Sequence, residues 1–135
     1  DLEDDKVLGF QVLRCDDYQF RPLPEIVDAI RARLGDAPVY LSVDIDVLDP
    51  SAAPGTGTPE AGGMTSRELL NSIRGLQGLN VVGAEIVEVS PAYDHAELTG
   101  LAAAQVGYEI LSLWAAQKAG HTSPTGPIAE RFAQN

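Results

Sequence analysis

The sequence has a single cysteine, few basic residues and no long apolar run. Cys15 has no second cysteine to pair with, which excludes an internal disulfide, fits a reducing compartment and predicts a small buried side chain. Nine Lys and Arg residues stand against 20 Asp and Glu residues, and the net charge of −11 argues against a nucleic-acid partner, because phosphate binding needs basic side chains. No apolar run approaches the roughly 20 residues of a membrane helix, so no membrane partner is expected.

The chain also lacks an initiator methionine and a signal peptide. It opens with an acidic run at residues 1–5, the opposite of the basic start of a secretory signal. We expect a piece of a longer protein of the cytoplasm, with the mitochondrion as the alternative for the full-length form. No repeat or interdomain linker divides the 135 residues, so residues 1–118 are expected to form one unit. Residues 119–135 are expected to form a loosely structured tail with a short helix near 129–132.

Apolar stretches and turn residues predict alternating strands and helices. Strands are expected in three apolar stretches, residues 7–13, 39–43 and 81–87, and the second is nearly continuous, as in a strand covered on both faces. Helices are expected over residues 23–34, 65–75 and 94–118. A glycine-rich and proline-rich loop is expected over residues 49–63. This order predicts an α/β fold with a parallel sheet and helices on its faces.

Capping residues predict where these helices begin and end. Gly35 is placed to stop the first helix. Thr65 and Glu68 have the spacing of a capping box for the second helix, and Asp94 with Glu97 is expected to cap the third.

Acidic residues follow two of the strands, at the end where open parallel sheets bind ligands. Asp44 and Asp46 end the strand at 39–43, and the period of two of a strand would place both carboxylates on one face. Buried neighbouring carboxylates repel, and a divalent cation removes the penalty. Oxygen ligands suit Mn²⁺, Mg²⁺ or Ca²⁺. The alternative is capping or surface salt bridging, and the buried strand favours the metal.

Further polar residues surround this predicted site. Glu88 ends the strand at 81–87, where its carboxylate could pair with the planar guanidinium of a substrate or with a neighbouring Arg. The loop around Thr56 and Thr58 offers hydroxyls and glycines that allow close approach to a ligand, unless it is only a structured connection. Asp49 precedes Pro50 and is expected to serve a turn.

Three long motifs resemble the ureohydrolase family, the arginases and agmatinases. They are residues 42–50 (SVDIDVLDP), residues 54–60 (PGTGTPE) with 62–65 (GGMT), and residues 83–94 (GAEIVEVSPAYD). Residues 98–104 are similar to the final helix of the family, and the likeness covers roughly residues 7–118. The forms at 55–57 and 91–94 resemble agmatinases and guanidinobutyrases more than arginases.

The resemblance implies a three-layer α/β/α fold with a parallel sheet, of which this chain is the incomplete carboxyl-terminal part. It implies Mn²⁺-dependent hydrolysis of a guanidino compound such as agmatine to urea and an amine, by a hydroxide bridging two ions. Asp44 and Asp46 would be metal ligands, Glu88 would hold the guanidinium and Thr58 would lie near the substrate. The complete protein would be a homo-oligomer acting on a small guanidino substrate, with a guanidino acid as the alternative.

The upstream part of the family's metal site has no counterpart here. A histidine ligand and an Asp-x-His-x-Asp run are missing, and His95 and His121 match neither, so both are expected to be solvated. Two aspartates cannot enclose two Mn²⁺ ions. We therefore expect this chain alone to bind Mn²⁺ weakly and to release no urea, and we assign no catalytic residue to it.

Three other interpretations compete with the resemblance. In a haloacid-dehalogenase-like phosphatase Asp44 would accept a phosphoryl group, but Leu48 stands where Thr or Val is usual and no Lys is well placed. A calcium loop would need a different acidic spacing and a closing Glu at the twelfth position. A non-catalytic partner of an intact ureohydrolase is the alternative from another class, and co-purification with a longer homologue would support it.

Overall fold

The computed structural model describes residues 2–120, and the centre of this part is a two-stranded parallel sheet. The strands are β1 (Val39–Asp44) and β2 (Val81–Val87). They pair in parallel, with Leu41 opposite Ala84 and Val43 opposite Ile86, and the register shifts between Val39 and Tyr40. Both strands lie where the apolar runs place them, because such residues fit a pleated, half-buried surface. The strands predicted at 39–43 and 81–87 and their parallel pairing are confirmed.

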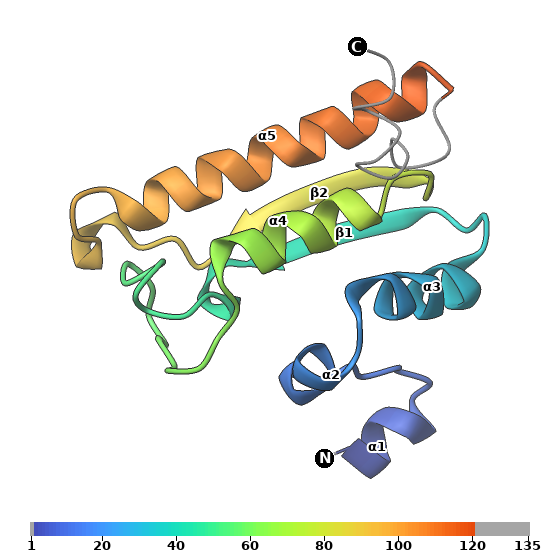
Figure 1. The fold of residues 1–135 in the computed structure, drawn as a ribbon, viewed down its shortest axis with the longest axis horizontal. Helices are drawn as coiled ribbons and strands as arrows, with labels where there is room; N and C mark the ends of the chain where they lie inside the picture. Colours follow the sequence, from blue (N-terminus) through green and yellow to red (C-terminus); the bar gives the residue numbers. More distant parts are fainter. Residues whose placement is uncertain (1, 121–135) are drawn as a thin grey trace.

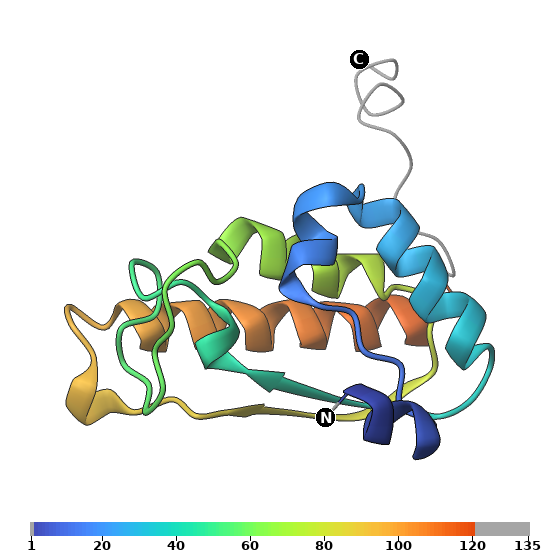
Figure 2. The same ribbon diagram turned by 90° about the horizontal axis from the view of Figure 1, so that it is seen from below.

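Helices precede, connect and follow the strands. They are α1 (Leu2–Val7), α2 (Cys15–Phe20), α3 (Leu23–Leu34), α4 (Ser66–Gly75) and α5 (Leu98–Lys118), with short 3₁₀ turns at Ile45–Val47 and Pro91–Tyr93. Figure 1 shows α5 running along the sheet beside α4, and Figure 2 shows α3, α4 and α5 on the same side of the strands. Within residues 2–120, no helix is both long and apolar enough to cross a membrane.

The core lies between the sheet and this layer of helices. Its buried side chains come from β1 and the turn after it, from α4 and from α5, and include Val43, Ile45, Leu48, Leu69, Ile73, Val106, Ile110 and Leu113. On the opposite face of the sheet, Tyr40, Ser42 and Glu85 are exposed. The prediction that the strand at 39–43 is covered on both faces is therefore wrong for the described residues, because their helices pack on one face only.

The amino-terminal part differs from the sequence prediction. Residues 10–14 form no strand, and Leu8 and Phe10 are exposed, with their N–H groups bonded to the carbonyls of Asp4 and Asp5. A strand needs a hydrogen-bonded neighbouring strand, and residues 7–13 have no such strand beside them within 2–120. The short helix α2 was not foreseen, although Asp17 accepts a hydrogen bond from the Arg14 N–H group at 2.9 Å and so holds the first turn.

Several features between residues 35 and 118 agree with the local sequence patterns. Gly35 follows α3 with a positive φ of 53°. Thr65 and Glu68 form the predicted capping box at the start of α4. No helix or strand interrupts residues 49–63, and α5 ends at Lys118. The tail predicted over 119–135 and its helix near 129–132 lie outside the described residues, apart from Ala119 and Gly120.

Candidate active site

The two predicted metal ligands lie at the carboxyl end of β1. Asp44 is the last residue of the strand, and Asp46 belongs to the 3₁₀ turn that follows. The Asp46 N–H group donates to Asp44 Oδ1 at 3.1 Å, so the turn brings the two residues together. The argument from strand periodicity is wrong because the strand ends before Asp46. Ile45 between them is fully buried and anchors the turn in the core.

Three carboxylates are close enough to influence one another. Partial burial raises the pKa of Asp44, the Asp46 N–H group lowers it, and the carboxylates of Asp46 and Glu88 raise it further, so that the net shift is upward. Neighbouring negative charges disfavour ionisation in this way. The fold thus brings Asp44, Asp46 and Glu88 to one end of the sheet, as expected for strands whose carboxyl ends meet at the same edge.

The loop after β1 folds back over these acids. The Thr58 hydroxyl donates to Asp46 Oδ2 in a short hydrogen bond. A Cβ atom added to Gly57 would stand 4.0 Å from Glu88 Oε2, which places this glycine beside the carboxylate. The four residues predicted to touch metal or substrate, Asp44, Asp46, Thr58 and Glu88, therefore converge.

Glu88 has an unusual backbone conformation. Its φ is 64°, in the left-handed region that residues with a Cβ rarely occupy. Such a conformation costs on the order of 1–3 kcal/mol and persists only where the surrounding structure imposes it. Here it turns the chain immediately after β2 and redirects the glutamate. The apolar strand predicts where Glu88 lies, but nothing in the sequence indicates this backbone angle.

Asp94 organises the start of α5. Its Oδ1 accepts the N–H groups of His95 at 2.9 Å and Thr99 at 3.0 Å, and its Oδ2 accepts that of Gly100 at 3.0 Å. The predicted cap of Asp94 with Glu97 is wrong in part, because Glu97 is the residue before the helix and its side chain makes no capping bond. Asp94 reaches the first turn from four residues upstream, and sequence spacing alone could not reveal this.

Hydrogen bonds to the start of α5 and to the end of β2 hold the loop at residues 49–63 in place. The Gly55 N–H group donates to the Thr99 hydroxyl at 2.7 Å, and the Gly55 carbonyl accepts the Ser90 N–H group at 2.8 Å. The loop is thereby tied both to the end of β2 and to α5. Sequence reasoning missed Thr99, which is fully buried. Thr56 Oγ1 is also buried and has no hydrogen-bond partner among the described residues.

Asp49 and Cys15 belong to the surroundings of the site. Asp49 serves a turn as predicted, because its carboxylate accepts the N–H groups of Ser51 and Gly62, each at 2.9 Å. Cys15 was expected to be buried and is exposed. Its Sγ lies 3.8 Å from the Gly62 carbonyl, at the rim of an acidic hollow of about 750 Å³ that also reaches Asp46.

The described residues do not complete a metal site by themselves. Within residues 2–120, no three His, Cys, Asp or Glu side chains are grouped so that they could hold an ion. His95 is exposed in the loop before α5, in agreement with the prediction that it is solvated. His121 lies outside the described part.

Neutralising Asp94 should weaken the structure in a pH-dependent way. Burial opposes ionisation, but the N–H groups of Thr99 and Gly100, the Thr99 hydroxyl and the His95 N–H group outweigh it, and the pKa of Asp94 falls from 3.8 to about 2. Because the pKa is lower in the folded state, the stabilisation is complete above the ordinary value and disappears as the pH falls through about 2. We expect Asp94→Asn to lower the melting temperature by several degrees at pH 7.

The matched control for this change is Glu97→Gln, which also removes one negative charge next to α5 but breaks no capping bond. Thermal unfolding followed by circular dichroism between pH 7 and pH 2 measures both variants. Equal melting temperatures for the two variants at pH 7, or an Asp94→Asn deficit that persists unchanged into strong acid, would contradict the role given to Asp94.

Comparison of the sequence with known families identifies the family of this chain. Residues 1–112 match the arginase family. The chain belongs to the arginase family. The assignment made from the three motifs is thereby confirmed.

Individual members of the arginase family agree in sequence and in structure. The agmatinase of Serratia proteamaculans (strain 568) is 52% identical over 110 residues, 82% of this chain and 36% of that protein. A solved structure of a hypothetical agmatinase from Burkholderia thailandensis matches with a TM-score of 0.80 and 46% identity, over 85% of this chain and 36% of the other. The proclavaminate amidino hydrolase from Streptomyces clavuligerus matches with a TM-score of 0.82 and 43% identity, over 85% and 38%.

These matches also define how much of an arginase-family protein is present. The chain spans between 28% and 38% of the length of the curated relatives it matches. The predicted fold class, an incomplete arginase-like α/β fold with a parallel sheet, is confirmed by the structural agreement.

Proposed function

We propose that this chain supplies the carboxyl-terminal part of the active site of an agmatinase-like ureohydrolase, which hydrolyses a guanidino compound such as agmatine to urea and an amine. The observation that carries the proposal is the convergence of Asp44, Asp46 and Glu88 at the carboxyl ends of two parallel strands. It occurs in a chain that is about half identical in sequence to agmatinases. The cytoplasmic location and the homo-oligomeric state expected from the sequence remain predictions.

Asp44 and Asp46 are the residues that would hold Mn²⁺. Their carboxylates offer the oxygen donors that such cations prefer, and an ion would offset both the burial and the repulsion from Asp46 and Glu88 that raise the pKa of Asp44. The donor set fits part of a site, because the described residues supply no third ligand beside these two. A bound pair of such ions lowers the pKa of water and polarises the reacting group. Thr58 holds Asp46 in orientation through its hydroxyl.

Glu88 is the residue that would bind the guanidinium group. A carboxylate matches the planar guanidinium fork with two parallel hydrogen bonds. The alternative expected from the sequence, a salt bridge with a neighbouring Arg, is not found among the ion pairs of the described residues. The strained backbone of Glu88 supports the same role, because such strain gathers at functional sites. The similarity to an enzyme named proclavaminate amidino hydrolase keeps a guanidino acid as the second candidate substrate.

The chain alone should bind Mn²⁺ weakly and release no urea from agmatine. Asp44→Asn should weaken Mn²⁺ binding by at least about tenfold, since even residues that only orient metal ligands contribute that much to affinity. Asp36→Asn, an exposed aspartate in the turn before β1, should leave binding unchanged. Electron paramagnetic resonance of free Mn²⁺ measures both variants, and turnover of agmatine at ordinary enzyme rates by the unmodified chain would refute the proposed incompleteness.

A chimeric protein tests the function directly. In it, this chain replaces the matching segment, 36% of the hypothetical agmatinase from Burkholderia thailandensis, so that the remainder of the arginase fold is present. We expect Mn²⁺-dependent release of urea, which Glu88→Gln removes while the chimera stays folded. A folded chimera that binds Mn²⁺ but releases urea from neither agmatine nor a guanidino acid would favour the non-catalytic interpretation.

A further inference from the structure

The loop at residues 49–63 has a buried base and an exposed tip. Gly55 is buried, whereas Gly57 and Thr58 are exposed. The Thr58 hydroxyl donates to one of the two predicted metal ligands, and Gly57 lies beside the Glu88 carboxylate. In both views the loop lies at the same end of the sheet as the start of α5 (Figures 1 and 2). The position of the tip at the candidate site therefore depends on how the base is held.

One buried hydroxyl group connects this base to α5. Thr99 is fully buried, and its hydroxyl accepts the Gly55 N–H group at 2.7 Å. Burial raises the pKa of Asp94, and the bond from the same hydroxyl is one of those that outweigh it. Because an ionised carboxylate only accepts and a hydroxyl has one proton, that proton goes to Asp94 and a lone pair faces Gly55. Asp94 thus fixes the direction of the bond that holds the loop.

The connection continues to the residue that would bind the guanidinium group. The Gly55 carbonyl accepts the Ser90 N–H group at 2.8 Å. Ser90 lies two positions after Glu88, whose φ of 64° persists only where the surrounding structure imposes it. Residues 88–90 belong to neither a helix nor a strand, so the bond to Gly55 fixes the chain directly after this left-handed residue.

We infer that Thr99 is a positioning residue: acting through the loop, its hydroxyl keeps Glu88 in the left-handed conformation that directs the carboxylate to the guanidinium. The inference rests on the proposed function, because it concerns the binding of a guanidino substrate by Glu88. Thr99 acts only through other residues. A misplacement of about 1 Å near a reacting group can lower a rate on the order of 100-fold, so a remote hydroxyl can decide how well the substrate is held.

Two substitutions separate this role from simple packing. Thr99→Val keeps the branched shape but removes the hydroxyl, which leaves the buried Gly55 N–H group without its acceptor. Thr99→Ser keeps the hydroxyl and removes only a methyl group. If the hydroxyl positions Glu88, the valine variant is the damaged one, whereas a packing role predicts that the serine variant is damaged more.

Kinetics of the chimeric protein measure the effect on substrate binding. The substrate is agmatine, or 4-guanidinobutyrate where the unmodified chimera prefers it. We expect Thr99→Val to raise KM by at least about tenfold. We expect Thr99→Ser to change KM by less than about twofold, and kcat to fall less than KM rises in the valine variant, because an interaction made before and during the reaction acts on KM. A valine variant with unchanged KM, or a serine variant with the larger loss, overturns the inference.

The matched control is Ser112→Ala on the same helix. The Ser112 hydroxyl donates to the Tyr108 carbonyl within α5, so its removal takes away a hydroxyl without touching the loop, and KM should not change. The Mn²⁺ concentration needed for half-maximal activity is measured in parallel. It should rise less than KM in Thr99→Val, since the turn of Asp44 and Asp46 has its own hydrogen bond. An equal rise in both quantities indicates general loosening and contradicts the inference.

Nuclear magnetic resonance of this chain measures the conformation of Glu88 without any activity. A residue in the left-handed region has a short distance between its own amide and Hα protons, which gives a strong nuclear Overhauser effect. We expect this signal for Glu88 in the unmodified chain, in Thr99→Ser and in Ser112→Ala, and its loss in Thr99→Val. A folded valine variant that keeps the signal overturns the inference.

Amide exchange covers the case in which the valine variant does not fold. The bonds of Gly55 and Ser90 should then protect their N–H groups in the unmodified chain and in Thr99→Ser. Rapid exchange of either group in a folded protein overturns the inference.

The two proposals fail in different ways. An unmodified chimera that releases no urea removes the proposed function, while the Glu88 signal still decides whether Thr99 holds this residue. An active chimera in which Thr99→Val changes neither KM nor the Glu88 signal keeps the function and removes the role of Thr99.

Discussion

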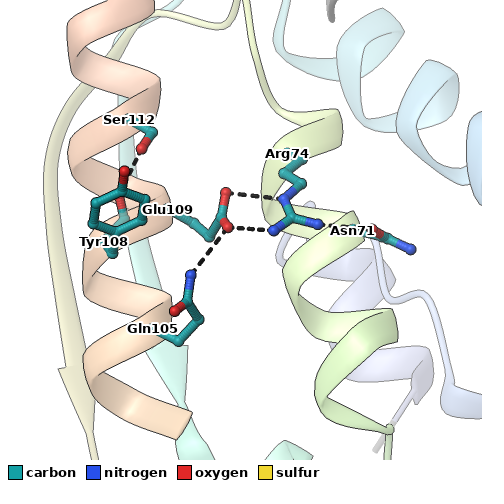
Figure 3. A network of polar contacts seen from close by, with 6 residues as sticks. All are labelled: Asn71, Arg74, Gln105, Tyr108, Glu109 and Ser112. Carbon is teal, nitrogen blue, oxygen red and sulfur yellow. Dashed lines mark hydrogen bonds and ion pairs between the residues drawn. The ribbon is translucent and has the colours of Figure 1, made fainter. Parts of the chain in front are cut away.

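Arg74→Met is expected to lower the free energy of unfolding by about 2–3 kcal/mol, because it leaves a buried carboxylate without its cation. Glu109 is only 8% exposed. Its two oxygens accept from the Arg74 guanidinium, with Nε at 3.0 Å from Oε2 and Nη2 in a short bond to Oε1 (Figure 3). This loss of stability is smaller than that for a fully buried ion pair, because the Arg74 side chain is half exposed to solvent.

The remaining contacts cannot replace the lost guanidinium. Gln105 Nε2 lies 3.3 Å from Glu109 Oε1, a single neutral donor at the long end of hydrogen-bond distances. Urea denaturation followed by circular dichroism measures the loss. Arg67→Met is the control, an exposed arginine on the same helix with no ion pair among the described residues, and it should change stability by less than about 0.5 kcal/mol.

The same ion pair predicts a dependence on pH. The hydrogen bonds from Arg74 lower the pKa of Glu109 against the opposing effect of burial. A carboxyl group with a lowered pKa in the folded state stabilises the protein above its ordinary pKa, and this stabilisation is lost as the pH falls through the folded value. Unmodified protein should therefore lose this increment in acid, while Arg74→Met should not. An identical acid slope in both proteins would contradict the assignment.

Gly55→Ala is expected to lower the free energy of unfolding by about 3 kcal/mol, which is near the upper end of the loss caused by overpacking a well-packed site. A Cβ atom at Gly55 would stand 2.6 Å from Asp94 Cβ and 2.8 Å from its Cα. Neither atom is the end of a flexible side chain, so the backbone must move. The movement would break the bonds from Gly55 to Thr99 and Ser90 and release the loop, so Mn²⁺ binding should weaken together with stability.

Gly57→Ala on the same loop is the control. Its added Cβ atom would meet only Glu88 Oε2, at 4.0 Å, which is ordinary contact distance. Denaturant unfolding and Mn²⁺ titration of the two variants separate the effects of crowding from those of adding a methyl group to the loop. If both glycines tolerate alanine equally, the close packing of Gly55 against Asp94 is not what holds the loop.

Several features of this protein follow from local sequence alone. The capping box of Thr65 and Glu68 starts α4 where predicted, and the apolar runs mark both β1 and β2. The motifs around Asp44 and Glu88 indicate the arginase family, to which residues 1–112 belong. These predictions succeed because helix caps, strand patterns and motifs depend on residues a few positions apart.

Other features were decided by packing between distant parts of the chain. The predicted strand at 7–13 does not form, since its apolar residues meet no neighbouring strand within 2–120. Asp44 and Asp46 meet through a 3₁₀ turn rather than through strand periodicity. The positive φ of Glu88 likewise depends on the loop packed beside it.

Local sequence patterns specify the positions of the two strands, of α3 and α4, and the family, because the hydrogen bonds and apolar periods involved join residues close in the chain. Which side chains meet depends on the packed structure. Arg74 pairs with Glu109 across 35 positions and Gly55 with Thr99 across 44. Such pairs form only after helices and strands have packed, so their identity depends on the geometry of the whole core.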